Sequence, residues 1–157
     1  MFMDTRQTEF EQMQSALLTL VDKMGKHHDQ GVRFGIETRL FPAEIHTVAA
    51  IGEGEGITVT QLAVRMQVSK PTISERIKRL VAKGVVQKQS VPDNAKAVTL
   101  WLTPDGKTAC ASHAAYHEQM YAVFRRCFGK EAEQKANLFK AVIKEISAWM
   151  DCLEEKG

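Results

Sequence analysis

Two histidines, His113 and His117, lie four residues apart in the segment HAAYH. On a helix this spacing puts both imidazoles on one face. Imidazole is a preferred zinc ligand, and a zinc site usually has about four ligands. The segment lacks the glutamate of H-E-x-x-H, because Ala114 stands in its place, so the general base of a zinc protease is missing. The pair indicates either half of a metal site or two polar residues on a helix surface.

His46, in the segment EIH, could supply a third imidazole from another helix, and His28 could supply the fourth ligand. The alternates for the fourth position are His27, Asp29, Glu37 and Glu44. The structural alternative for each histidine is a hydrogen-bonded polar residue on a half-apolar helix. Two or three imidazoles suit several divalent transition metals, so the pattern predicts zinc or another such metal and does not separate zinc from nickel, cobalt or manganese.

Other catalytic motifs are missing from the sequence. The segment GEGEG at 52–56 has neither the lysine nor the context of a phosphate-binding loop, and no G-x-S-x-G is present. The cysteines, Cys110, Cys127 and Cys152, form no C-x-x-C pair, which argues against a disulfide framework and a zinc ribbon. Cys110 lies one turn before His113 and could be a ligand, a redox switch or a small buried residue. We predict that the chain is not an enzyme.

The composition is that of a soluble globular domain. Hydrophobic residues make up 44% and charged residues 25% of the 157 residues. No apolar run approaches the ~18 residues that span a bilayer, and the polar, acidic N-terminus is not typical of a signal peptide. We therefore expect one domain over residues 1–157, in the cytoplasm and without a membrane partner.

Positive charge is concentrated in one third of the chain. Residues 65–96 hold eight Lys or Arg against Glu75 and Asp93, a net +6, whereas the whole chain carries +2, which leaves −4 elsewhere. A basic island on a mildly acidic body is typical of a nucleic-acid surface. A solvated charged helix face is the alternative.

The apolar spacing predicts six helices and one β-hairpin. Thr8 with Glu11 fits a capping box for a first helix that ends in the glycine-punctuated segment 25–35. The second helix begins at Pro42, the third is capped by Thr58 or Thr60, and the fourth runs from its cap Ser69 to Gly84. Residues 85–90 and 97–103 are strands joined by turn residues, followed by helices over 104–129 and 131–155.

This order predicts a mainly α fold with a small β wing, a winged helix-turn-helix. The terminal helices, in the parts 5–35 and 104–156, look too apolar to be covered within one small domain, so we expect them to pack against a second copy. Burial within one chain is the alternative. The winged helix-turn-helix over 40–103 would be the DNA-binding lobe.

The helix-turn-helix lies at residues 60–84. The residues expected to face its core are Leu62, Ala63, Met66, Val68, Ile73, Ile77, Leu80 and Val81. The second of its helices would present its N-terminal end and outer face to the major groove. The base contacts expected there are Thr72, Ser74 and Glu75. The phosphate contacts expected are Ser69, Lys70, Lys78 and Arg79, with Pro71 on the same outward face.

Two further contacts are expected at the edges of this surface. Arg76 is borderline, because it could pair with an acidic neighbour or reach the DNA backbone. Lys96 lies at the tip of the hairpin, and such a wing follows the backbone or the minor groove.

The segment from LFPAEIHTV to TPDGK, residues 40–107, resembles the winged helix-turn-helix of the MarR family of bacterial transcription regulators. The resemblance implies a homodimer joined by the terminal helices and a pseudo-palindromic operator in double-stranded DNA, and we expect repression by operator occupancy. Gln67 stands where such motifs commonly have a turn glycine, at a cost of roughly 1 kcal/mol. The wing segment at 93–97 reads DNAKA, without the family's two arginines, so Lys96 would be a weaker substitute.

The histidines are similar to those of the zinc-responsive, AdcR-type members of this family. The resemblance implies that His46, His113 and His117 are ligands and that metal promotes operator binding, whereas the family's carboxylate ligand falls near His28. A second site of that type has no clean match here, with Phe34 near its cysteine position. The other regulators considered are a small aromatic or acidic effector and cysteine oxidation. A protein-interaction module without a DNA role is the alternative of another class.

Overall fold

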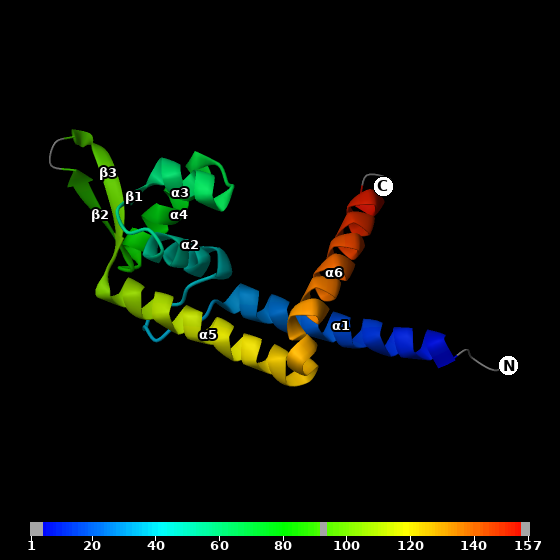
Figure 1. The fold of residues 1–157 in the computed structure, drawn as a ribbon. Helices are drawn as coiled ribbons and strands as arrows, with labels where there is room; N and C mark the ends of the chain where they lie inside the picture. The colour runs from blue at the N-terminus through cyan, green and yellow to red at the C-terminus, as the bar shows by residue number, and fades with distance from the viewer. Residues whose placement is uncertain (1–4, 92–93, 155–157) are drawn as a thin grey trace. The chain divides into compact units, whose positions relative to one another are not determined.

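The computed structural model describes the backbone of residues 5–91 and 94–154, and their side chains except those of 5–7, 27, 28, 91, 94–97, 153 and 154. The elements in chain order are α1 (Thr5–Gln30), α2 (Pro42–Gly52), β1 (Ile57–Thr58), α3 (Val59–Met66), α4 (Lys70–Ala82), β2 (Val86–Val91), β3 (Asn94–Leu102), α5 (Pro104–Phe128), the 3-10 turn η1 (Gly129–Glu131) and α6 (Ala132–Glu154) (Figure 1). The chain forms two compact units, Met1–His113 and Ala114–Gly157. The expected class, mainly α with a small β wing, is confirmed.

Local hydrogen bonds explain where the helices of the winged lobe begin. The Ser69 hydroxyl accepts the Thr72 backbone N–H at 3.3 Å and so caps α4. The Thr58 hydroxyl accepts the Gln61 N–H at 3.3 Å, and the Gln61 side chain accepts the Thr58 N–H at 2.9 Å, which completes a capping box. These caps and Pro42 at the start of α2 confirm the predicted starts.

The start predicted for the first helix is wrong. The helix α1 begins at Thr5 rather than after a cap at Thr8, so Thr8 lies inside its first turn. At its other end, the Arg39 guanidinium donates to the carbonyls of Gln30 and Gly31 at 3.0 and 3.2 Å. These two bonds satisfy carbonyls that the end of a helix leaves without partners.

The wing is part of a three-stranded antiparallel sheet in the order β1-β3-β2. The predicted hairpin pairs β2 with β3, with Val86 opposite Leu102, and a register shift occurs between Ser90 and Val91. The third strand was not predicted, because β1 has only two residues; it pairs Ile57 with Leu100.

The core of the lobe lies between α2, α3, α4 and the sheet. Its fully buried side chains include Val48, Ile51, Leu62, Ile73, Ile77, Leu80 and Leu100. Met66 and Val68 are partly buried against this core, as predicted. Val81 is 38% exposed, so its predicted place in the buried stripe is wrong. The turn between α3 and α4 holds Gln67 in the left-handed region at φ 54°, the strained conformation expected there.

Candidate nucleic-acid interface and histidine cluster

The outer face of α4 is exposed and carries three cations and one anion. Ile73, Ile77 and Leu80 anchor the helix in the core, so the residues between them turn outward. The exposed residues are Lys70, Pro71, Thr72, Glu75, Lys78 and Arg79, whereas Ser74 is half-buried. Ser69, the exposed cap, also lies 2.7 Å from the Thr72 hydroxyl. The structure therefore brings these predicted contact residues onto one surface.

Within this surface, Glu75 and Lys78 form a close ion pair. Their charged atoms are 2.6 Å apart, and both side chains are more than half exposed. The hydrogen bond from Lys78, together with its charge and that of Arg79, lowers the pKa of the Glu75 carboxyl. This carboxylate is thus held in its ionised form among cations.

The structure places Arg76 half-buried against α2 rather than on the outer face. Its guanidinium donates to the Thr47 hydroxyl at 3.1 Å. Thr47 is fully buried and donates in turn to the Ala43 carbonyl at 2.7 Å. Sequence reasoning missed this contact, because a single threonine in an otherwise apolar helix carries no sign of a distant partner.

A second tie joins the end of α4 to α2. The Lys83 ammonium lies 2.6 Å from the Glu44 carboxylate, which is almost fully buried. Lys83 also donates to the Arg39 carbonyl at 3.0 Å and lies over the Phe41 ring. Because Lys83 already neutralises Glu44, the structure gives this carboxylate a structural role rather than the alternate role of metal ligand.

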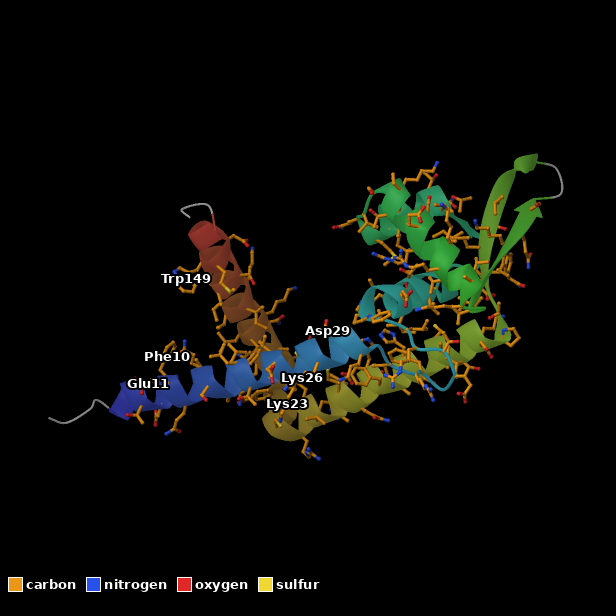
Figure 2. The ribbon with its side chains drawn as sticks, turned by 180° about the vertical axis from the view of Figure 1, so that it is seen from behind. Phe10, Glu11, Lys23, Lys26, Asp29 and Trp149 are labelled. Carbon is orange, nitrogen blue, oxygen red and sulfur yellow. The ribbon has the colours of Figure 1, made fainter. Side chains whose placement is uncertain are left out.

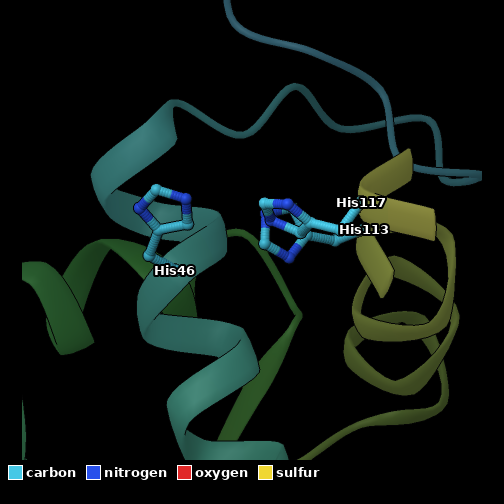
Figure 3. A group of neighbouring side chains, drawn as sticks. All are labelled: His46, His113 and His117. Carbon is cyan, nitrogen blue, oxygen red and sulfur yellow. The ribbon is translucent and has the colours of Figure 1, made fainter. Parts of the chain in front are cut away.

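Three histidines come together at α2 and α5. Potential ligand atoms of His46, His113 and His117 all lie within 4.8 Å of one another (Figure 3). His113 is buried, with its ring edge-on to those of His46 and Phe34 at 5.2 and 5.5 Å between centroids, whereas the other two histidines are exposed.

The distances fit a transition-metal site. A tetrahedral zinc ion binds nitrogens at about 2.0–2.1 Å, which places its ligands roughly 3.4 Å apart. Small side-chain rotations would bring the three imidazoles to that spacing. The predicted fourth ligand, His28, lies in α1, but its side chain is outside the described residues, as is that of Lys96 in β3.

The other candidate ligands named from the sequence are not grouped with these three histidines among the described residues. Glu37 is paired with Arg33 at 3.6 Å. Cys110 does not join the cluster found among the described residues. Burial, with a smaller effect of Glu53, raises the pKa of the Cys110 thiol. A raised pKa keeps this sulfur in the less reactive protonated form, which favours the packing role over a redox role.

Residues 40–97 match the MarR family. The chain is 29% identical over 125 residues to YhjH, an uncharacterized HTH-type transcriptional regulator of Bacillus subtilis. The aligned region covers 79% of this chain and 71% of YhjH. A crystal structure of Streptococcus pneumoniae FabT in complex with DNA has a TM-score of 0.62 and 21% identity, over 92% of this chain and 97% of FabT.

The fold is also similar to that of Lactococcus lactis ZitR, described as a zinc-responsive MarR family member. The TM-score is 0.62 and the identity 13%, over 90% of this chain and 99% of ZitR. At these identities the solved structures establish the fold alone, a winged helix-turn-helix. The matched family and the relative in Bacillus subtilis are transcriptional regulators, not enzymes.

Proposed function

We propose, from a winged helix-turn-helix whose residues 40–97 match the MarR family, that this chain regulates transcription by binding double-stranded DNA. The observation that carries the proposal is the exposed outer face of α4, where Lys70, Lys78 and Arg79 lie on a helix anchored in the core. Such a helix can enter the major groove. Bound at an operator, the protein would exclude polymerase and act as a repressor in the cytoplasm.

The contacts divide by chemistry. Thr72 and Ser74 are short polar side chains near the N-terminus of α4 and suit hydrogen bonds to base edges. The phosphate contacts proposed are Ser69, Lys70, Lys78 and Arg79, with Lys96 reaching the backbone from the wing. Because phosphate contacts release counterions, affinity for DNA falls steeply as the salt concentration rises.

The experiment compares Arg79→Ala with Thr72→Ala on operator variants. Arg79→Ala weakens binding to all sequences alike, whereas Thr72→Ala changes the ranking of the sequences. Equal scaling by both variants on every operator would contradict this division. A gel-shift assay with random duplex at low salt tests the wider proposal: no shift at micromolar protein favours the protein-interaction module instead.

A homodimer completes the proposed reading surface. The helices α1 and α6 each carry an exposed apolar face, which includes Phe10, 59% exposed, and Trp149, 63% exposed (Figure 2). Apolar faces of this extent favour burial against another copy. A twofold dimer places two α4 helices on two half-sites, which is why the operator is expected to be pseudo-palindromic.

The proposal includes control by a divalent metal, with zinc as the first candidate. Three imidazoles within reach of one ion, His46, His113 and His117, support it, and His28 is the proposed fourth ligand. Such an ion would tie α2 to α5 and favour some spacings of the two DNA-binding lobes over others. Metal analysis of gently purified protein tests this step, and protein that holds no metal and binds none on titration would count against it.

A further inference from the structure

Glu75 is the one acidic residue of α4. The buried residues Ile73 and Ile77 lie two positions to either side of it, so its side chain is directed almost directly away from the core. It is therefore near the middle of the outer face of α4, among the cations described above. In the proposed complex with DNA, this is the part of the helix that lies deepest in the major groove.

Helix stability does not explain a carboxylate at this position. The Glu75–Lys78 pair is exposed on both sides, and such pairs contribute little to stability. Toward DNA, a carboxylate is repelled by phosphates and by the acceptor atoms of bases. Its presence is favourable only opposite a base that offers a hydrogen-bond donor.

The four base pairs differ in this respect. In the major groove, guanine presents two acceptors and thymine one, adenine presents a donor beside an acceptor, and cytosine presents only its N4 amino donor. A carboxylate is therefore matched by cytosine, partly opposed by adenine and rejected by guanine and thymine. The low pKa of Glu75 keeps it an acceptor, and Lys78 fixes its direction at 2.6 Å.

We propose that Glu75 is a specificity-determining residue that accepts a hydrogen bond from the N4 amino group of one cytosine in each operator half-site. This inference rests on the proposed DNA-binding function and adds the base chemistry of one position.

The test is selection of bound sequences from a randomised duplex with the wild-type protein and with Glu75→Gln. The wild type selects cytosine at one position of each half-site, by about tenfold or more over guanine and thymine. Glu75→Gln loses that preference at that position alone and shifts it toward adenine, because an amide can pair with both the donor and the acceptor of adenine. Its affinity for random duplex rises, since one repulsive charge is gone.

The matched control is Glu131→Gln. Glu131 forms a similar ion pair with Lys135, at 2.8 Å, but lies outside the winged lobe, so its variant selects the wild-type sequence. Circular dichroism checks that Glu75→Gln keeps the helical content. A sequence profile that is unchanged in Glu75→Gln, or affinities scaled equally for all four bases, overturns the inference while the DNA-binding function stands. A wild-type protein that binds duplex without preferring any base overturns the inference alone, and one that binds no duplex overturns both.

Discussion

Lys83, the C-cap residue that follows α4, is bound to the buried carboxylate of Glu44 at the start of α2. The same carboxylate accepts the backbone N–H of Phe41 at 3.0 Å, so it also caps α2. Arg39, whose carbonyl accepts from Lys83, holds the end of α1. This ion pair therefore joins the end of α4 to the start of α2, and Arg39 links it to the end of α1.

Removal of one partner of this pair should be costly. Lys83→Met leaves the buried Glu44 carboxylate with only the longer contact to Arg79, at 3.9 Å, which costs about 3 kcal/mol of the free energy of unfolding. Adding Glu44→Gln to Lys83→Met removes the buried negative charge but keeps a side-chain oxygen that can cap α2. The double variant is therefore expected to recover much of the loss, measured by urea denaturation. A double variant as unstable as the sum of both single variants would show that the two residues act independently.

The left-handed turn before α4 makes a second prediction. Gln67 has φ 54°, a conformation in which any residue with a Cβ atom is strained. Gln67→Gly should therefore raise the free energy of unfolding by up to about 1 kcal/mol. Gln67→Ala keeps the Cβ atom and should not. The midpoint of thermal unfolding measures both, and equal midpoints for the two variants would argue against strain at this residue.

A close approach at the start of α5 makes a third prediction. A Cβ atom on Gly106 would lie 2.0 Å from the Val85 carbonyl oxygen, a backbone atom that cannot move aside cheaply. Gly106→Ala should therefore destabilise the protein by about 1–3 kcal/mol. Lys107→Ala, at the next and exposed position, is the control and should change the stability by less than about 1 kcal/mol. Chemical denaturation of both variants checks the difference.

The fold could be predicted largely from local signals. Pro42, Thr58 and Ser69 mark helix starts through their own backbone chemistry, and the period of Ile73, Ile77 and Leu80 defines the buried face of α4. Local signals fail where tertiary contacts decide. The strand β1 exists only because Ile57 and Thr58 pair with β3, and a two-residue strand has no periodicity to detect.

The candidate site divides in the same way. The exposed face of α4 follows from helical period alone, and the spacing of His113 and His117 from one helix turn. That His46 approaches them depends on the packing of α2 against α5, which only the resemblance to a known family suggested. Arg76 contacts Thr47 and Glu44 contacts Lys83, and in each pair the two residues come from distant parts of the sequence. No sequence pattern indicated either pair.

The proposed dimer interface can be tested with a charge on α6. Trp149 lies on the apolar side of this helix with Val142 and Ile146, whereas Lys140 lies nearly opposite by helical period. Trp149→Glu would bury a carboxylate in the interface and should raise the dimer dissociation constant at least tenfold. Lys140→Glu, the matched control, should leave it nearly unchanged. Light scattering during gel filtration over a dilution series measures both, and a wild-type monomer throughout would refute the dimer.

The last prediction concerns the histidine cluster, where binding of a metal ion would be coupled to binding of DNA. If zinc binds the state with the favourable lobe spacing more tightly, saturating zinc raises operator affinity, by about 5–150-fold for a coupling of typical size. A chelator should reverse the change. His117→Ala removes an exposed ligand and should weaken zinc binding at least tenfold, and with it the response, without loss of the fold.

His113→Ala should have the same effect on zinc binding, but His113 is buried against Phe34, so its stability must be measured alongside. Glu37→Gln is the control, because Glu37 is fully exposed and paired with Arg33, and it should keep the wild-type affinity for zinc. Calorimetric titration with zinc and operator binding with and without zinc provide the two measurements. Operator affinity that is the same in both conditions would rule out metal control, whereas zinc binding that survives in both histidine variants would place the metal elsewhere. Because the coupling is reciprocal, operator DNA must also tighten zinc binding by the same factor, an independent check on the same protein.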